Sequence, residues 1–264
     1  MTALVQSVKN ILRPLKRKLE ANLPRNIRVS PPIVQVYLGG EYESRYSLVN
    51  FPSLFSPLTA YTCIYDIALY GADGSCVGTR SIPIKPFGSY EVRPHEVFGN
   101  NLPDMGMFTA RIRSESSLDF SDKHLGKITS HIYALYSDKA QKSFALVHPQ
   151  TTVSSVSADK AEWMSAFLWD SGSIRKVVAI QINPTSRPIE STLFLFRDGD
   201  AANRVCERRG VIPPMGARRV EWDLTEAGLR QGLFSIGAVG LPTANAKPIV
   251  LTYFEDGTFS GMHS

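Results

Sequence analysis

The residues best suited to chemistry are three histidines that stand in or after strand-like runs. His148 ends the run SFALVH, His263 ends the run TFSGMH, and His131 stands in ITSHIYALY. If a hairpin turn falls midway between His131 and His148, the two rings lie across from each other on neighbouring strands, which makes them the best metal candidate in the chain. A protein zinc site needs three or four ligands, and no further ligand can be identified. We therefore predict no metal site.

The same histidines have a second interpretation, as ligand-binding side chains. His131, His148 and His263, together with Trp222, form our candidate ligand-binding set. The structural alternative for the strand-ending pair is a half-buried ring bonded to a nearby carbonyl, and for the tryptophan it is core packing.

Carboxylates offer the other route to catalysis. Four of them are predicted on strands that follow a Pro-x-Gly step: Glu91, Glu96, Glu221 and Asp223. A glycosidase carboxylate pair leaves no linear motif, so two of them could form one, although solvated strand faces are the alternative. The chain lacks Gly-x-Ser-x-Gly, a phosphate-binding loop, His-Glu-x-x-His and Cys-x-x-Cys. We therefore expect no catalytic residue and no cofactor.

Composition is that of a folded globular chain. The sequence has 264 residues, of which 43% are apolar and 20% charged. No run approaches the ~20 apolar residues of a transmembrane helix, and the N-terminus lacks a secretory core. The three cysteines, Cys63, Cys76 and Cys206, are too few for a disulfide framework and are predicted to be buried thiols.

Positive charge is concentrated at the N-terminus. Residues 1–28 hold seven basic residues and one acidic residue, a net of +6 against +5 for the whole chain, so the remaining residues sum to −1. Apolar residues in this segment recur every three or four positions: Leu4, Val8, Ile11, Leu15 and Leu19. That spacing predicts an amphipathic helix, which Pro14 would kink.

Three roles are open for this basic leader. It could dock on protein, lie on an anionic membrane surface, or act as a targeting segment. The residues expected to contact a membrane or partner are the cations Lys9, Arg13, Lys16, Arg17 and Lys18. Nucleic acid is not expected, because the basic stretch lacks interleaved aromatics and the rest of the chain has no basic surplus. A cytoplasmic location, with attachment at the membrane surface, fits this pattern.

From Ile33 onward the sequence predicts strands and repeats itself. Short runs rich in Val, Ile, Tyr, Phe and Thr are punctuated by turn residues. TRSIPIKPFGSYEV corresponds to RRGVIPPMGARRVEW, and IYALYSDKAQKSFALVH corresponds to IVLTYFEDGTFSGMH. In the second pair Tyr253, Phe259 and His263 are expected at the places of Tyr136, Phe144 and His148.

This repetition predicts an all-β chain built by internal duplication. We expect two tandem antiparallel β-sandwich domains, immunoglobulin-like or jelly-roll, behind the helical leader. The predicted boundaries are a leader at 1–28, a first sandwich at 29–149, a Ser/Thr-rich linker at 150–161 and a second sandwich at 162–264. Alternate residues should face the cores, among them Tyr65, Ile67 and Leu69.

The function predicted from these features is binding rather than catalysis. We expect a non-enzymatic binding or scaffold protein at a membrane surface or in a larger assembly. Its partners would be protein or anionic lipid, carbohydrate is a further candidate ligand, and exposed strand edges could pair copies into a homo-oligomer. One alternative is a carbohydrate-active or metal-dependent enzyme with its site in the first domain. The other is a structural component of a particle or surface layer.

Overall fold

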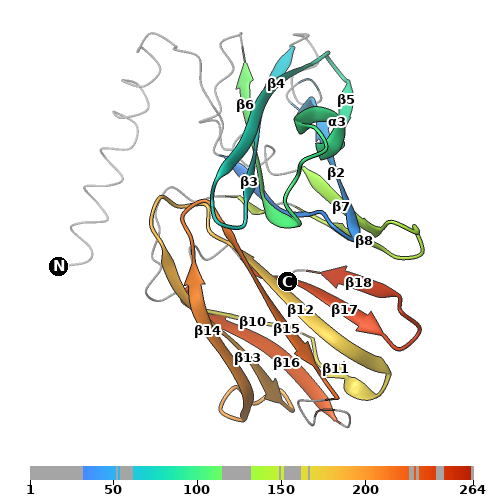
Figure 1. Ribbon diagram of the computed structural model, residues 1–264, viewed down its shortest axis with the longest axis vertical. Helices are drawn as coiled ribbons and strands as arrows, with labels where there is room; N and C mark the ends of the chain where they lie inside the picture. The colour runs from blue at the N-terminus through green and yellow to red at the C-terminus, as the bar shows by residue number, and fades with distance from the viewer. Residues whose placement is uncertain are drawn as a thin grey trace, which may run out of the picture.

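The computed structural model describes residues 32–51, 53, 62–114, 132–148, 150–151, 162–165, 167–225, 229, 232–241 and 247–262. The predicted leader, with Lys9, Arg13, Lys16, Arg17 and Lys18, lies outside them, as do His131, His263 and most of the predicted linker. Nearly all the described secondary structure is β (Figure 1). No helix of the described residues has the length and apolar character to span a bilayer.

The first half, residues 32–151, contains nine strands and one short helix among its described residues. Their bounds are β1 (Ile33–Leu38), β2 (Tyr42–Val49), β3 (Cys63–Gly71), β4 (Cys76–Ile84), β5 (Ser89–Val92), α3 (Pro94–Phe98), β6 (Met105–Ser114), β7 (Tyr133–Asp138), β8 (Phe144–Val147) and β9 (Gln150–Thr151).

The second half, residues 162–262, contains nine further strands and one 3₁₀ turn among its described residues. Their bounds are β10 (Glu162–Met164), β11 (Trp169–Asp170), η2 (Ser171–Ser173), β12 (Ile174–Ile182), β13 (Ile189–Arg197), β14 (Arg204–Ile212), β15 (Ala217–Asp223), β16 (Leu233–Val239), β17 (Ile249–Phe254) and β18 (Phe259–Met262).

The strands form four antiparallel sheets, two in each half. Sheet A has the order β4-β3-β6-β1-β9 and sheet B the order β5-β2-β7-β8. Sheet C runs β14-β13-β16-β10, with β11 also paired to β16, and sheet D runs β15-β12-β17-β18. The order of sheet C therefore matches that of sheet A except for β9, and the order of sheet D matches that of sheet B.

Local irregularities also recur at corresponding points. The β3–β4 hairpin has a register shift between Leu69 and Tyr70, and the β13–β14 hairpin has one between Leu195 and Phe196. Both hairpins turn at an Asp-Gly pair, where Gly74 and Gly199 have positive φ values of 86° and 73°. Such backbone favours glycine, because it lacks a Cβ.

Alternation within the strands builds the cores as expected. Tyr65, Ile67 and Leu69 on β3 are at most 1% exposed, and Leu193 and Leu195 on β13 are fully buried. Because successive side chains of a strand point to opposite faces, these residues share the inner face of their sheets.

The two halves are joined by apolar packing. Residues on the outer face of sheet D belong to the same buried cluster as the core of the first half: Val178, Ile180, Ile182, Ala217, Ile249, Leu251 and Phe259. The Ala217 amide donates to the Ala72 carbonyl at 3.0 Å, and the Tyr42 and Tyr253 hydroxyls are hydrogen-bonded. Figure 1 shows β8 and β18 facing each other across this junction.

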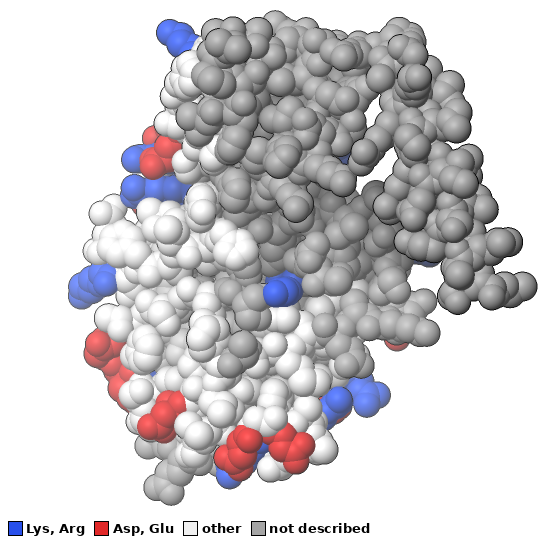
Figure 2. Space-filling model, turned by 180° about the vertical axis from the view of Figure 1, so that it is seen from behind, with Lys and Arg blue, Asp and Glu red and all other residues white. Residues whose placement is uncertain are grey.

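Charge on the far side of the molecule is mixed. Figure 2 shows basic and acidic side chains interspersed around the margin of the described surface, with mostly uncharged side chains between them.

Three details differ from the sequence-based expectations. Glu96 lies in helix α3 instead of a strand, because Pro94 fixes a helical φ at the first turn. Cys63 is buried but Cys76 is exposed and Cys206 partly exposed, since β4 and β14 are edge strands. Register places Phe259 opposite Tyr253 and Phe144 opposite Ser137, so Tyr253 occupies the place of Ser137, one residue from Tyr136.

Candidate functional site

Of the three candidate histidines, His148 alone lies among the described residues. His148 is exposed just after β8. The β7–β8 ladder pairs Ala134 with Val147, so its next step would set His148 opposite Tyr133, two residues away from His131. His131 lies outside the described residues, so its pairing with His148 stays a prediction. Within the described residues, no cluster of three or more His, Cys, Asp or Glu side chains is arranged to hold a metal ion.

Trp222 lies in the core of the second half. Its side chain is 2% exposed and packs among buried residues of β12, β16 and β17. Its indole N–H has no hydrogen-bond partner among the residues that the structure describes. A ligand could reach this ring only if the second half opened.

The candidate carboxylates pair with cations instead of with each other. Glu91 Oε1 lies 2.7 Å from Arg93 Nε, and Glu96 Oε1 lies 3.9 Å from Nη1 of the same guanidinium. Glu221 contacts Lys176 Nζ at 3.0 Å and Arg219 Nη2 at 2.9 Å. Asp223 accepts from the Thr225 amide at the end of β15. This is the geometry of surface ion pairs, and it differs from the two facing carboxylates of a glycosidase.

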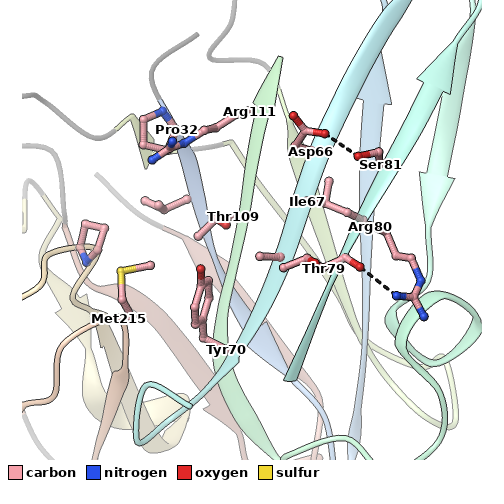
Figure 3. Close-up of a pocket in the computed structure, with 13 residues that line it drawn as sticks. Pro32, Asp66, Ile67, Tyr70, Thr79, Arg80, Ser81, Thr109, Arg111 and Met215 are labelled. Carbon is pink, nitrogen blue, oxygen red and sulfur yellow. Dashed lines mark hydrogen bonds between the residues drawn. The ribbon is translucent and has the colours of Figure 1, made fainter. Parts of the chain in front are cut away.

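A groove of about 650 Å³ lies on the outer face of sheet A, where the second half meets it. Its floor and sides come from β1, β3, β4 and β6, and Pro184 and Met215 of the second half close one side. In Figure 3, Tyr70 and Met215 lie near each other at one end, and Asp66 and Arg111 lie at the other. The groove therefore has one apolar, aromatic end and one charged end.

Hydroxyl groups line the groove between these ends. They belong to Thr79 and Ser81 on β4, Thr109 on β6 and Tyr70 on β3. Burial raises the pKa of the Tyr70 phenol, so the group stays protonated and can donate a hydrogen bond.

The charged end contains one closed ion pair. Asp66 accepts from Arg113 Nε at 3.0 Å and from Ser81 Oγ at 2.6 Å. The Arg113 guanidinium, which donates to this carboxylate, holds the pKa of Asp66 below its usual value. Asp66 is therefore ionised at neutral pH and already partnered.

Arg80 of the groove has no acidic partner among the described residues, although its Nη1 donates to the Thr79 carbonyl at 2.9 Å, and Arg111 lacks even such a contact. Arg111 stands directly opposite Asp66 in the β3–β6 ladder, yet Asp66 binds Arg113 on the diagonal. Among the described residues, the Arg111 side chain has neither an ion pair nor a hydrogen bond. Its guanidinium is thus available to a carboxylate or other oxyanion in the groove.

The second half holds its side of the groove with a tight turn. Met215 has a φ of 55°, in the left-handed region, and the Gly216 amide donates to the Pro213 carbonyl at 3.1 Å. The Met215 amide donates to the Thr185 carbonyl at 3.0 Å, which ties this turn to the loop that carries Pro184. Backbone hydrogen bonds therefore hold the turn with Met215 and link it to the loop with Pro184.

Sequence reasoning did not find this groove. Most of its polar residues occupy alternate positions on three strands, so they look like the solvent-facing half of ordinary strands. The one available signal is the alternation along the strand. Asp66, Ala68 and Tyr70 alternate with the core residues Tyr65, Ile67 and Leu69, so they lie on the opposite face.

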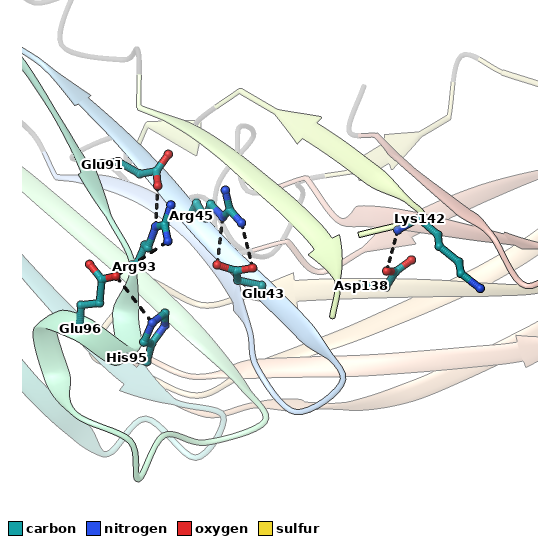
Figure 4. Close-up of polar contacts among 8 residues, drawn as sticks. All are labelled: Glu43, Arg45, Glu91, Arg93, His95, Glu96, Asp138 and Lys142. Atoms are coloured by element: carbon teal, nitrogen blue, oxygen red, sulfur yellow. Dashed lines mark hydrogen bonds and ion pairs between the residues drawn. The ribbon is translucent and has the colours of Figure 1, made fainter. Parts of the chain in front are cut away.

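A second, more polar hollow of about 650 Å³ lies between the β1–β2 turn, helix α3 and the β7–β8 turn. Its lining includes Glu43, Arg45 and Arg93, and Figure 4 shows Arg45 paired with Glu43 and Arg93 paired with Glu91. Arg45 is locked to Glu43 by two hydrogen bonds of 3.0 Å, which lower the pKa of Glu43. Most of its cations are thus neutralised within the chain.

Comparison with known proteins gives no family. No protein-family model and no curated protein sequence matches the chain. Among solved structures, the chain has 8% identity and a TM-score of 0.21 to a glycosyl hydrolase family 2 member from Bacteroides cellulosilyticus. It has 8% identity and a TM-score of 0.19 to a β-glucuronidase of glycoside hydrolase family 2, and 9% and 0.17 to a β-D-mannosidase from Dictyoglomus thermophilum.

These similarities cover 86–89% of this chain but only 24–27% of the other chains. The chain thus spans about a quarter of the length of those structures.

Proposed function

We propose that this protein is a non-enzymatic binding or scaffold protein, and that the groove on sheet A is its ligand site. The observation that carries the proposal is the unpartnered Arg111 guanidinium at one end of a hydroxyl-lined groove. Walls from both halves pre-form the groove, so little ordering entropy is lost when a ligand binds.

The chemistry of the groove fits a carbohydrate that bears a carboxylate. Hydroxyl side chains exchange hydrogen bonds with sugar hydroxyls, and the exposed part of Tyr70 offers a face for a sugar ring. Arg111 supplies a planar donor pair for a carboxylate. Asp66 is already bound to Arg113, so it contributes polarity without leaving an unpaired charge.

Titration calorimetry with a uronic-acid oligosaccharide and a neutral oligosaccharide of equal length tests this site. We expect the acidic ligand to bind more tightly, and Arg111→Gln to weaken it by about tenfold or more, as loss of a charged hydrogen bond implies. Arg209→Gln, on the exposed edge strand β14, is the matched control and should bind normally. Equal binding by the Arg111 and Arg209 variants, or none by the parent chain, contradicts the assignment.

We propose further that the basic leader attaches the protein to an anionic membrane surface. Five cations, Lys9, Arg13, Lys16, Arg17 and Lys18, accompany an apolar stripe at helical spacing. Each cation near such a surface contributes about 1 kcal/mol. Co-sedimentation with anionic and neutral liposomes should show binding by the full chain to anionic vesicles only. A chain that begins at Val29 should stay in the supernatant, and equal behaviour of the two chains would exclude this role.

We also infer that the two halves are tandem sandwiches derived from one duplicated unit. The inference is supported by the matching sheet orders and by the register shifts at Leu69/Tyr70 and Leu195/Phe196. It is supported again by the Pro-x-Gly turns, where Phe87 and Met215 both adopt positive φ at 58° and 55°.

A further inference from the structure

The outer face of sheet B is exposed along β8, only partly exposed along β2, and divided into two stripes. Register places the side chains of this face in rows across β2, β7 and β8. One row runs through Arg45, Leu135 and Leu146, and the next runs through Glu43, Ser137 and Phe144. The β7–β8 side is apolar, since Phe144 is 52% and Leu146 66% exposed. The β2–β5 side carries the ion pairs of Figure 4.

The corresponding face in the second half is buried. Sheet D has the same strand order as sheet B, and Leu251 and Phe259 stand where Leu135 and Phe144 stand. Leu251 is 1% and Phe259 6% exposed, because the first half packs on them. The chain therefore already uses one of these two equivalent faces as an interface. Large apolar side chains left exposed on the other mark it as an interaction surface.

We propose that the outer face of sheet B binds the same face of a second copy of this chain. The charges of the face are self-complementary about one axis. A two-fold axis perpendicular to the strands, between the two rows, sets Glu43 against Arg45 of the partner. The same axis sets Phe144 against Leu146 of the partner. Both stripes then meet a suitable counterpart in one isologous contact, the commonest form of dimer.

The area of this face indicates how strongly two copies should associate. Four strands at about 4.8 Å spacing, each contributing about five residues of about 3.3 Å, give a face of roughly 15 Å by 17 Å. That is below the area of a standard protein interface, so we expect weak and reversible association.

Sedimentation equilibrium of the full chain, from about 5 to 500 µM, tests the contact. We expect reversible dimers, and we expect Phe144→Ser and Leu146→Ser each to remove them without loss of folded signal. Val211→Ser is the control, since Val211 is 54% exposed on β14, away from this face, and should dimerise normally. A chain that stays monomeric throughout, or dimers that survive both face variants, would overturn the proposal.

A charge exchange tests the register of the contact. Glu43→Arg and Arg45→Glu should each dissociate the dimer, because each sets like charges against one another across the axis. An equimolar mixture of the two variants should associate again, as each then faces its opposite. Failure of the mixture to associate, with both chains folded, would overturn the proposed axis.

Discussion

Asn50 and Asn183 stand at the same point of the two halves and share two hydrogen bonds. Each is fully buried and follows the last residue of a strand, β2 or β12. Asn50 Nδ2 donates to the Ile84 carbonyl at 3.0 Å, and Asn183 Nδ2 donates to the Ile212 carbonyl at 3.1 Å. Their backbone amides donate to the Gly88 and Gly216 carbonyls, both at 2.9 Å. Each asparagine thus closes the end of a hairpin strand against the Pro-x-Gly turn.

Replacing either asparagine should destabilise the fold. Asn50→Ala and Asn183→Ala each leave buried carbonyls without donors, which should lower the free energy of unfolding by about 2 to 4 kcal/mol. Asn100→Ala, at an exposed position, should change it by less than about 0.5 kcal/mol. Urea unfolding followed by circular dichroism measures all three. Similar stability of the three variants would mean that the hydrogen bonds of the Asn50 and Asn183 side chains contribute little to stability.

The junction of the halves depends on a glycine in a hairpin turn. A Cβ at Gly74 would collide with the carbonyl oxygen of Pro214, whereas a Cβ at Gly257 would meet no atom within 4 Å. Their φ values, 86° and 82°, are nearly equal, so Gly257→Ala measures the backbone strain alone. Gly74→Ala should lower the free energy of unfolding by about 1 to 3 kcal/mol more than Gly257→Ala does, which is the usual penalty for steric overlap. If thermal or urea unfolding showed the same loss of stability for both variants, the contact between Gly74 and Pro214 would not contribute to stability.

The two closing-strand phenylalanines should differ sharply in their contribution to stability. The Phe259 ring packs edge-on against Tyr42 at a centroid distance of 5.8 Å and is 6% exposed. Phe259→Ala should therefore cost about 3 to 5 kcal/mol. Phe144→Ala, at the equivalent place, should cost less than about 1 kcal/mol in dilute solution, because that side chain is half exposed. A comparable loss for both would contradict the difference in burial.

The groove carboxylate should titrate at lower pH than an ordinary aspartate. Arg113 lowers the pKa of Asp66 in the folded state. The pair therefore contributes stability above the unfolded pKa of Asp66, and this contribution is lost as pH falls through the lower folded pKa. It is small, since the Asp66 side chain is 39% exposed.

NMR titration of the Asp66 carboxyl carbon measures this shift directly. Arg113→Gln should raise the pKa of Asp66 toward its usual value, and Arg209→Gln should leave it unchanged. A pKa that does not respond to loss of Arg113 would exclude this ion pair in solution.

Local patterns in the sequence determined the all-β class, many strand positions and the hairpin turns. Alternation places Tyr65, Ile67 and Leu69 in the core, because the pleat sends every second side chain to one face. Asp73-Gly74 and Asp198-Gly199 specify tight turns, because glycine tolerates positive φ. These features depend on neighbours in the chain, which is why a single sequence reveals them.

Tertiary structure alone decided which face of each sheet is covered and which is free. Phe144 and Phe259 each begin the closing strand of their half, yet one is exposed and the other buried. The reason is that the first half packs on sheet D, whereas nothing described packs on the same face of sheet B. The groove likewise joins Arg111, Thr79 and Met215, which are distant in sequence. A polar residue at an outward position has the same pattern whether it meets water or lines a site, so only the packing of the two halves distinguishes these cases.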